Sequence, residues 1–442
     1  MRKESSHWKS KLLISVIVFV LLTPFIAFAD DAAYNARIEK LEAAVRALQK
    51  ELKKLKAERP AKVPSLDARV LEELVDKKFE EKRDDFGAVP EWVQNMQWFG
   101  DFRFRFEHMD ETDTVDNDQY RRLRIRARLG LKAKVNDEWD AIFRIATGNA
   151  GTTSTDETLG DAFANDPLDL DWAYAHWHPV SYPGLDVYAG KIKNPFYRAG
   201  KNQMIWDSDI TPEGGAMSYN WAVNDAVQAF VNAGAFVIDD QSAGADASLF
   251  ALQGYAKYKF DNNTKLKAGA SLYCFTNIDD EARLGGTDSD HGRTFLGNTF
   301  NASNRYEYDY DIVEAFGEYA FHCGTMPVSI FGSYINNKAA PNTRNTGYFV
   351  GFKINKAKKP GSWQFSYDFR DMDPDATWAG MNDSDFLDGG TDGRGHKLSF
   401  KYQLAKNVAT GLTYFYNDRH DLTNNRTDSF KRFQWDLIYK FK

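Results

Sequence analysis

The chain has 442 residues, with 56 Lys and Arg against 63 Asp and Glu, so its formal net charge is −7. This acidic total gives no reason to expect nucleic acid as a partner. Mean hydropathy is −0.55, and after residue 30 no apolar run is long enough for a membrane-spanning helix. Aromatic residues make up 14% of the chain. That share exceeds what most soluble domains need, and it fits the aromatic girdles of a transmembrane β-barrel.

The N-terminus has the pattern of a secretory signal peptide. Four Lys and Arg residues within 2–11 precede the apolar run 12–28, and Ala27-Phe28-Ala29 supplies an A-x-A cleavage site. We expect cleavage after Ala29, so that 1–29 is the signal peptide. Because 1–29 holds four cations and one anion, its removal changes the formal charge from −7 to −10. An uncleaved membrane anchor is the alternative.

The next segment, 30–59, is predicted to form a coiled-coil helix in the periplasm. Its apolar residues alternate spacings of three and four, as in a heptad seam, at Ile38, Leu41, Val45, Leu48, Leu52 and Leu55. Such a seam is buried only when another helix covers it, so it predicts self-association. The alternative is an amphipathic helix lying on its own barrel. Pro60 and Pro64 end this helix, and 60–91 is predicted to be a short helix and linker.

The remainder, 92–442, shows the two-residue period of β-strands. In 120–135 the odd positions from Leu123 to Val135 are apolar, and the even ones are cationic except for Gly130. Side chains of a strand leave opposite faces in turn. In a transmembrane barrel the apolar face meets lipid and the polar face lines a wet interior. A soluble sheet with its apolar face on a dry core is the alternative.

The connections between these strands alternate between long and short, which is typical of outer-membrane barrels. Long loops are expected near 110–118, 150–166, 194–213, 277–309, 371–394 and 418–428. Short turns are expected at 136–138, 179–184, 222–226, 261–264, 322–327, 356–362 and 405–407. The fold class is therefore all-β: a transmembrane antiparallel β-barrel of about 16 strands, preceded by the N-terminal helical coiled coil.

The two cysteines, Cys274 and Cys323, are expected at opposite ends of neighbouring strands. That separation is beyond the reach of a disulfide, about 4.4–6.8 Å between Cα atoms. Two free thiols are predicted.

A row of cations on one strand face is the first candidate site. These residues, the basic ladder, are Arg122, Arg124, Arg126, Arg128 and Lys132. Alternate residues of a strand lie about 6.6 Å apart, so the ladder would line the lumen and attract anions. The alternative is that neighbouring carboxylates such as Glu107 or Asp140 pair with it and cancel most of the field.

The loop 194–213 is the second candidate site. It carries apolar anchors at Phe196, Ile205 and Trp206, which an exposed loop would not need. A loop folded into the barrel could pack them on the inner wall. Its acidic residues Asp207, Asp209 and Glu213 would then face the basic ladder across a constriction.

Other chemistry has weaker signals. His176 and His178, with Asp169 and Asp171, could suggest a metal site, but histidines two apart at a strand end are more often interfacial. No nucleophile motif is present, so no metal, cofactor or catalytic residue is expected, and the protein is not expected to be an enzyme. A barrel enzyme with scattered catalytic residues is the alternative.

Several runs of residues resemble the "putative porin" family of Gram-negative outer membranes, over roughly 92–442. They lie at 122–136, 144–148, 154–160, 190–196 and 206–214. The arginine-rich strand is more distantly similar to phosphate-selective porins. The final strand, with Phe433, Trp435, Leu437, Tyr439 and Phe441 on one face, resembles the C-terminal signal of outer-membrane proteins, although Lys442 follows the last aromatic residue.

The resemblance implies a pore-forming barrel in the outer membrane of a Gram-negative bacterium. We expect passive diffusion of small hydrophilic solutes or ions. Outer-membrane lipid and further copies of the chain are the other expected partners, with a trimer favoured by analogy. The alternative is a non-conducting barrel that anchors the envelope through its coiled-coil tether.

Overall fold

The structure is a computed structural model that describes residues 95–112, 117–148, 152–242, 245–261, 263–282, 284, 294–421 and 426–441. The chain divides into two units, Met1–Ala88 and Val89–Lys442, and the described residues belong to the second. The predicted signal peptide (1–29), coiled coil (30–59) and linker (60–91) lie outside the described residues. Among the residues described, no helix is long and apolar enough to cross a membrane.

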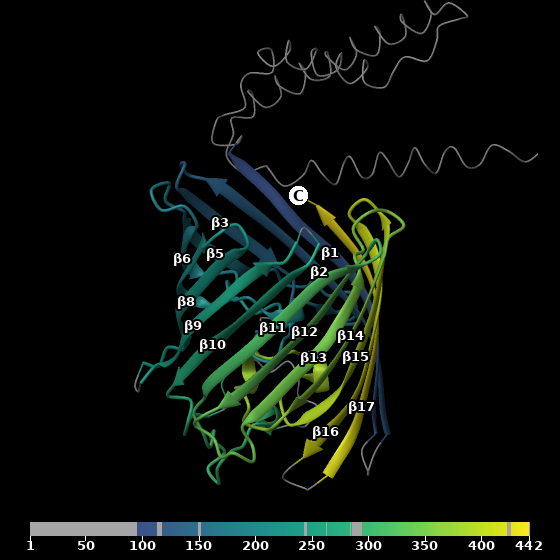
Figure 1. The fold of residues 1–442 in the computed structure, drawn as a ribbon. Coiled ribbons are helices and arrows are strands. Elements are labelled where there is room, and N and C mark those ends of the chain that lie inside the picture. The colour runs from purple at the N-terminus through teal and green to yellow at the C-terminus, as the bar shows by residue number, and fades with distance from the viewer. Residues whose placement is uncertain are drawn as a thin grey trace, which may run out of the picture. The chain divides into compact units, whose positions relative to one another are not determined.

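The described part of the chain is built from strands and a few turns of 3-10 helix (Figure 1). The strands are β1 (Met96–Thr112), β2 (Asn117–Lys134), β3 (Trp139–Ala146), β4 (Glu157–Thr158), β5 (Asp169–Trp177), β6 (Leu185–Lys191), β7 (Glu213–Ala222), β8 (Val227–Asp239), β9 (Ala247–Lys259), β10 (Lys265–Thr276), β11 (Asp311–Cys323), β12 (Met326–Asn337), β13 (Thr346–Asn355), β14 (Trp363–Met372), β15 (Gly393–Ala405), β16 (Val408–Asp421) and β17 (Arg426–Phe441). The 3-10 helices are η1 (Ala199–Lys201), η2 (Thr294–Gly297), η3 (Ala379–Met381) and η4 (Phe386–Asp388).

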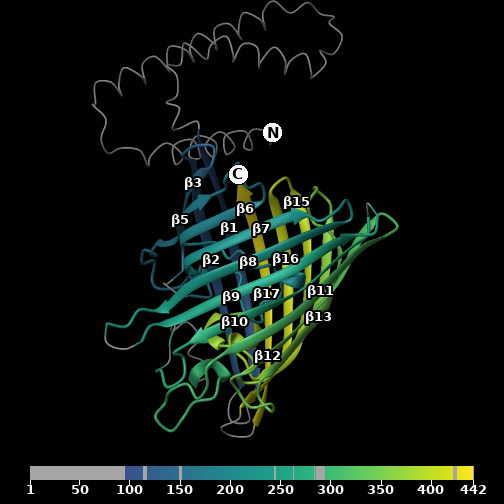
Figure 2. The same cartoon turned by 60° about the vertical axis from the view of Figure 1, so that its left-hand side comes forward.

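Sixteen of these strands form a closed antiparallel wall, as the sequence predicts. Each wall strand pairs with its neighbours in chain order, and β1 pairs with β17, where Phe102 lies opposite Tyr439. The two-residue strand β4 pairs with β2 at Arg124 and Ile125, beyond the end of the short β3. Because β1 and β17 pair with each other, neither terminal strand leaves the open edge that hydrocarbon could not satisfy. Figure 2 shows β6 to β10 side by side and tilted.

The hairpin connections sort into two ends of the barrel. We call the end with the short connections, such as 135–138 and 406–407, the turn end, and the opposite end the loop end. The prediction of long loops at 110–118 and 418–428 is wrong. β1 continues to Thr112 and β2 begins at Asn117, while β16 continues to Asp421 and β17 begins at Arg426. The polar side chains near 110 and 420 therefore extend hairpins, because alternating polar residues are as compatible with strands above the membrane as with loops.

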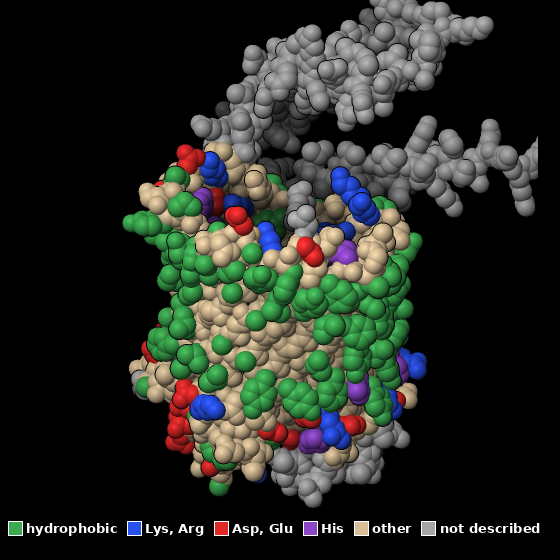
Figure 3. Space-filling view, viewed as in Figure 1, with side chains coloured by type: hydrophobic (Ala, Val, Ile, Leu, Met, Phe, Trp, Pro, Cys, Tyr) green, Lys and Arg blue, Asp and Glu red, His purple; other side chains and the backbone are tan. Residues whose placement is uncertain are grey.

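Apolar side chains point outward along the wall, as the alternation predicts. Leu123 and Leu129 are 43% and 41% exposed, whereas Arg126 on the opposite face is 9% exposed. On the face seen in Figure 3, the side chains between the two ends of the wall that stand out by type are hydrophobic, and charged ones gather at the two ends. The last strand follows the same rule, since Trp435 and Phe441 are also exposed. This distribution suits a hydrocarbon surround rather than water.

The interior differs from the expected wet lumen because it contains an apolar core. Inward residues of β8 to β14 pack there against residues of three connections: 192–212, the described part of 277–310, and 373–392. We call 192–212 the crossing loop and 373–392 the Asp/Gly loop. The buried aromatic residues that the wall strands contribute to this core are Phe236, Tyr273, Phe275, Phe316, Phe331 and Phe349.

The two cysteines are free and exposed. Cys274 lies near the loop end of β10, and Cys323 ends β11 at the turn end, which confirms the prediction.

Candidate functional site

The crossing loop traverses the interior from the end of β6 to the far wall. The Tyr197 hydroxyl donates to Glu318 of β11 at 2.6 Å, and the Tyr197 amide donates to Gln253 of β9 at 2.7 Å. Gly200 lies against β12 with φ +59°, where a Cβ would come within 2.2 Å of the Phe331 ring. Only glycine fits both that conformation and that approach. The segment is therefore inside the barrel, as its sequence suggested.

Apolar anchors hold the crossing loop in place. Phe196 and Trp206 stack with ring centroids 5.8 Å apart, and both meet Phe236 and Tyr273 of the wall edge-on. Ile205 and Trp206 are each 2% exposed. Burial of a large aromatic side chain contributes roughly 2–3 kcal/mol. Phe196, Ile205 and Trp206, the three anchors expected from the sequence, are therefore buried, as expected for a loop that folds into the barrel.

Asp207 joins the crossing loop to the Asp/Gly loop. The Asp207 amide donates to the Met381 carbonyl at 2.7 Å, and its carboxylate accepts from the Ser384 amide at 3.0 Å. Burial, followed by the nearby carboxylates Asp209 and Asp383, raises the pKa of Asp207 well above its usual range. Asp207 therefore connects two loops and does not face the basic ladder.

Of the acidic residues Asp209 and Glu213, only the first contacts the basic ladder. Asp209 Oδ1 lies 3.1 Å from Arg128 Nη1, so this loop carboxylate does meet the basic ladder. Glu213 begins β7 and forms an ion pair with Lys191 at 2.5 Å, with 63% of its side chain exposed. Of the three acidic residues named from the sequence, the structure brings only Asp209 to the ladder.

The basic ladder is paired with carboxylates along its length. Arg126 and Arg128 both bind Asp101 at 2.7 Å, one to each carboxylate oxygen. Glu107 accepts from Arg122, and Arg124 lies 3.9 Å from the same carboxylate. The ladder residues are Arg122, Arg124, Arg126, Arg128 and Lys132, and the last of these binds Asp140 at 2.8 Å. The alternative considered from the sequence, in which carboxylates such as Glu107 and Asp140 pair with the ladder, is therefore the one that the structure shows.

The pairing extends over the inner faces of β1, β2 and β17. Loop carboxylates enter it, since Asp156 binds Arg103 and Asp385 binds Arg432 at 3.0 Å. Among the described residues, seven arginines face seven carboxylates. The arginines are Arg103, Arg105, Arg122, Arg124, Arg126, Arg128 and Arg432, and the carboxylates are Asp101, Glu107, Asp156, Asp209, Asp385, Asp388 and Asp436. Formal charges in this network cancel.

Sequence reasoning missed several members of this network. Asp101, Arg103 and Arg105 alternate with phenylalanines in β1, so a period of two could have placed them inside. Asp156 and Asp385 lie in loops, where no periodicity indicates which way a side chain points. Only the fold brings them to the wall.

Two cavities formed by the described residues flank the crossing loop. The larger, about 480 Å³, lies toward the loop end where the short strands β3, β5 and β6 stop, and Asp209 and Trp206 line it. The other, about 390 Å³, is lined by Asp101, Arg128 and Lys440 nearer the turn end. Ile210 and Thr211 line both. The segment 208–211 of the crossing loop thus stands between the two cavities, beside the contact of Asp209 with Arg128.

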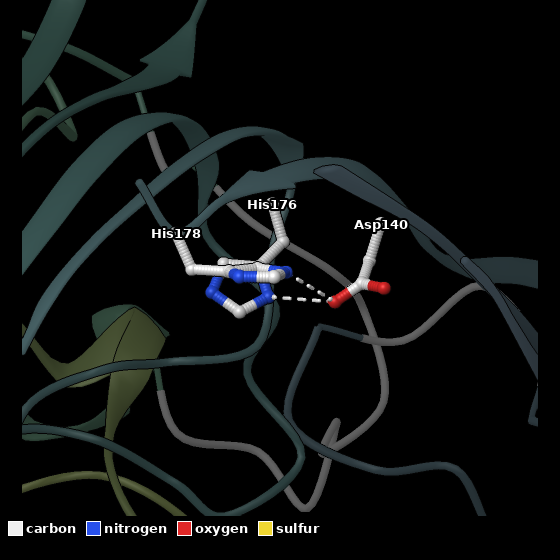
Figure 4. A group of neighbouring side chains, drawn as sticks. All are labelled: Asp140, His176 and His178. Atoms are coloured by element: carbon white, nitrogen blue, oxygen red, sulfur yellow. Dashed lines mark hydrogen bonds and ion pairs between the residues drawn. The ribbon is translucent and has the colours of Figure 1, made fainter. Parts of the chain in front are cut away.

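The histidines considered as metal ligands lie beside a different carboxylate from those expected. Asp171 pairs with Arg144 of β3. Asp140 of β3 instead lies near His176 and His178, with the ring nitrogens and a carboxylate oxygen all within 4.8 Å of one another (Figure 4). This group is the strongest candidate for a metal-binding site among the described residues.

Comparison with known proteins places the chain in a family. No curated protein matches it in sequence. In fold it is similar to the high-pH structure of Pseudomonas putida OprB, with 11% identity, a TM-score of 0.50 and coverage of 81% of this chain and 97% of that one. It is also similar to the outer membrane channel DcaP of Acinetobacter baumannii, with 16% identity, a TM-score of 0.45 and coverage of 78% and 97%. Residues 108–294 and 297–441 match the family model described as "Putative porin", so the chain belongs to that family.

Proposed function

We propose that the chain forms a water-filled channel through which small hydrophilic solutes or ions diffuse passively across the outer membrane. Family membership and the closed barrel support an outer-membrane channel. The observation that carries the finer proposal is the contact of Asp209 with Arg128 between the two cavities. A channel with a built constriction needs charged groups at such a point.

The constriction has opposed charges with Asp209 on the loop and Arg128 on the wall. Opposed charges at a narrow point create a transverse field, which orients dipolar solutes and orders water. Because the arginines and carboxylates of the network balance, the network itself favours neither sign of charge. We therefore favour small polar or zwitterionic solutes over simple anions, although arginines are prominent.

The proposal also includes the orientation of the barrel in the membrane and the association of its copies. Outer-membrane barrels keep short turns on the periplasmic side and long loops outside, so the turn end and the preceding N-terminal helix would face the periplasm. Copies of the chain would associate through the wall and the coiled coil, with a trimer favoured by analogy. The role is transport, and we propose no enzymatic activity.

The proposal is tested by single-channel recording in planar bilayers. Wild-type protein should show discrete conductance steps, and a variant lacking 200–210 should show larger ones, because the segment that crosses the interior is shortened. The matched control removes 160–165, an exposed part of a loop-end connection, and should leave the step size unchanged. If correctly folded wild-type barrel gave no steps, the channel would be disproved. If the 200–210 deletion conducted like wild type, this loop would not be the constriction.

Solute preference requires a second measurement. Liposome swelling with uncharged sugars, zwitterionic amino acids and phosphate should rank the zwitterions fastest among solutes of similar size. A preference for phosphate would indicate that the paired arginines still present a net positive field.

A further inference from the structure

A cluster of two histidines and an aspartate lies on the interior face at the turn end, away from the constriction. Asp140 is the second residue of β3 and lies directly opposite His176 of β5 in the strand register. His178 follows two residues later on the same face, just beyond β5. The outward neighbours Trp139 and Trp177 stack on the other side of the wall, so the cluster faces inward.

The three side chains offer ligand atoms that all lie within 4.8 Å of one another. Asp140 Oδ2 lies 3.0 Å from His178 Nε2 and 3.5 Å from His176 Nδ1. A tetrahedral Zn²⁺ with bonds of 2.0–2.2 Å separates its ligand atoms by about 3.3–3.6 Å. Only small side-chain shifts would be needed for all three atoms to reach one ion. Figure 4 shows both rings directed at the same carboxylate oxygen.

A second carboxylate orients His176 independently of Asp140. His176 Nε2 lies 2.8 Å from Asp186 Oδ1, so a proton on Nε2 is held there and Nδ1 keeps its lone pair for a metal. Tyr188 stacks on the same ring with centroids 4.7 Å apart. Metal-binding histidines commonly have such an outer carboxylate, which fixes the tautomer and the ring plane. The hydrogen bonds between Asp140 and the two histidines do not by themselves require that Asp186 and Tyr188 also hold the His176 ring.

Lys132 explains how the cluster is stable without an ion. Its Nζ lies 2.8 Å from Asp140 Oδ2, and 40% of the Lys132 side chain is exposed whereas the Asp140 side chain is 3% exposed. A buried carboxylate needs a counter-charge. The flexible lysine supplies it and can move into water when a cation replaces it.

We propose that Asp140, His176 and His178 bind one divalent transition-metal ion of the Zn²⁺ class, with water completing the coordination. Two imidazoles and one carboxylate are ligands that such ions prefer, whereas Ca²⁺ and Mg²⁺ prefer oxygen ligands. The proposal does not depend on conduction, because binding can be measured on the folded barrel alone. It assigns Lys132 a role as a built-in competitor of the ion.

Isothermal titration calorimetry with Zn²⁺ on tag-free, chelator-treated protein in detergent tests the site. Wild type should take up one ion per chain, and Co²⁺ at the same site should give the intense visible absorption of low coordination number. His176→Ala and His178→Ala should each weaken binding by about 100-fold. Asp186→Asn should weaken it by about 10-fold, since outer-shell changes typically cost 10- to 100-fold.

The Lys132→Met variant separates this proposal from a simple polar cluster. Removal of the competing cation should tighten Zn²⁺ binding, whereas Lys191→Met, which removes an equally paired lysine at the loop end, should not. His322→Ala, whose ring Nδ1 lies 3.2 Å from the Asn263 carbonyl oxygen and outside the cluster, is the histidine control and should bind like wild type.

Two results would overturn the proposal. One is wild-type protein that shows no saturable uptake up to about 1 mM Zn²⁺. The other is uptake that both histidine variants and Lys132→Met leave unchanged. Heat-modifiable migration on gels verifies that each variant is folded, and the wild-type titration remains decisive if a histidine variant fails to fold.

Discussion

The two halves of the barrel interior are built on different physics. On the inner faces of β1, β2 and β17, arginines meet carboxylates, and two loops enter through Asp156 and Asp385. We call this the charged half. On the inner faces of β8 to β14, apolar residues, many of them aromatic, pack against the crossing loop and the Asp/Gly loop, and Trp206 is part of this cluster. We call this the apolar half.

The difference shows what each half demands of the residues that fill it. A buried charge is tolerated only when partners lie at hydrogen-bond distance, so the charged half fixes individual side chains. An apolar surface needs only side chains of suitable volume and shape. The apolar half therefore holds each loop through its whole packed surface rather than through single contacts. Breaking the first should destabilise the wall, and breaking the second should release a loop.

Arg432→Met should have the largest effect, and it tests the charged half. Arg432 is 1% exposed and binds Asp385 and Asp388. Truncation takes this arginine away from the buried carboxylate of Asp388 and the partly buried one of Asp385, at a cost of about 3–5 kcal/mol. The midpoint of urea unfolding, followed by tryptophan fluorescence, should fall accordingly. Arg394→Met, at a pair whose arginine side chain is 54% exposed, is the control. An equal loss in both variants would refute the importance of burial.

Trp206→Ala tests the apolar half and should act mainly on the crossing loop. Loss of a buried tryptophan costs about 3–5 kcal/mol of packing, but the strand pairing of the wall is intact. We therefore expect faster proteolytic cleavage within 192–212 and a smaller shift of global unfolding than for Arg432→Met. Phe163→Ala removes a fully exposed aromatic residue and should change neither quantity. Unaltered cleavage in Trp206→Ala would mean that the anchors do not hold the loop.

The boundary between the halves is the contact of Asp209 with Arg128. Arg128→Gln leaves excess negative charge there, and Asp209→Asn leaves excess positive charge. Reversal potentials in a salt gradient should shift toward cation preference in the first and toward anion preference in the second. The double variant should return close to wild type. Shifts of the same sign would rule out a field centred on this pair.

The smallest expected effect concerns pH and the junction at Asp207. Because the pKa of Asp207 in the folded loop is raised by burial and by Asp209 and Asp383, the docked loop holds a proton that the free loop releases. Docking is therefore strongest below the ordinary carboxyl pKa of about 3.9 and weakens as pH rises to the raised pKa, by at most about 1.4 kcal/mol per pH unit.

Current noise from transient loop release should accordingly increase with pH across that window in wild type. Asp207→Asn cannot titrate and should show a flat profile. A wild-type profile that is equally flat would contradict the shifted pKa.

The wall was predictable from the sequence because a period of two follows directly from strand geometry. The segment 120–135 alone gives the direction of the β2 side chains from Tyr120 to Lys134. Phe196, Ile205 and Trp206 indicate a loop that needs an inner surface. The inner surface itself had a signal that the alternation argument overlooked. In β12, Ile330 and Tyr334 point outward while Phe331 and Ile335 point inward, so apolar residues on both faces of one strand mark contact with a plug.

The partners of the charged residues were beyond the sequence. Arg105 and Asp385 are 280 positions apart, and their contact depends on how a loop folds back into a barrel already closed. Periodicity says that Arg105 faces inward and says nothing of what it meets. The same holds for Asp140 and His176, which strand register brings opposite each other but which no local motif connects.

The pairing of β1 with β17 has a consequence for how the molecule assembles. Phe102 pairs with Tyr439, 337 positions later. The loss of chain entropy on closing a ring of that length costs about 5 kcal/mol of free energy. Before this seam forms, both terminal strands present rows of bare amides and carbonyls that lipid cannot solvate. Insertion into a bilayer therefore cannot proceed stably one hairpin at a time. Biogenesis must either complete the circle in one concerted event or lend the unfinished sheet a temporary edge from another protein.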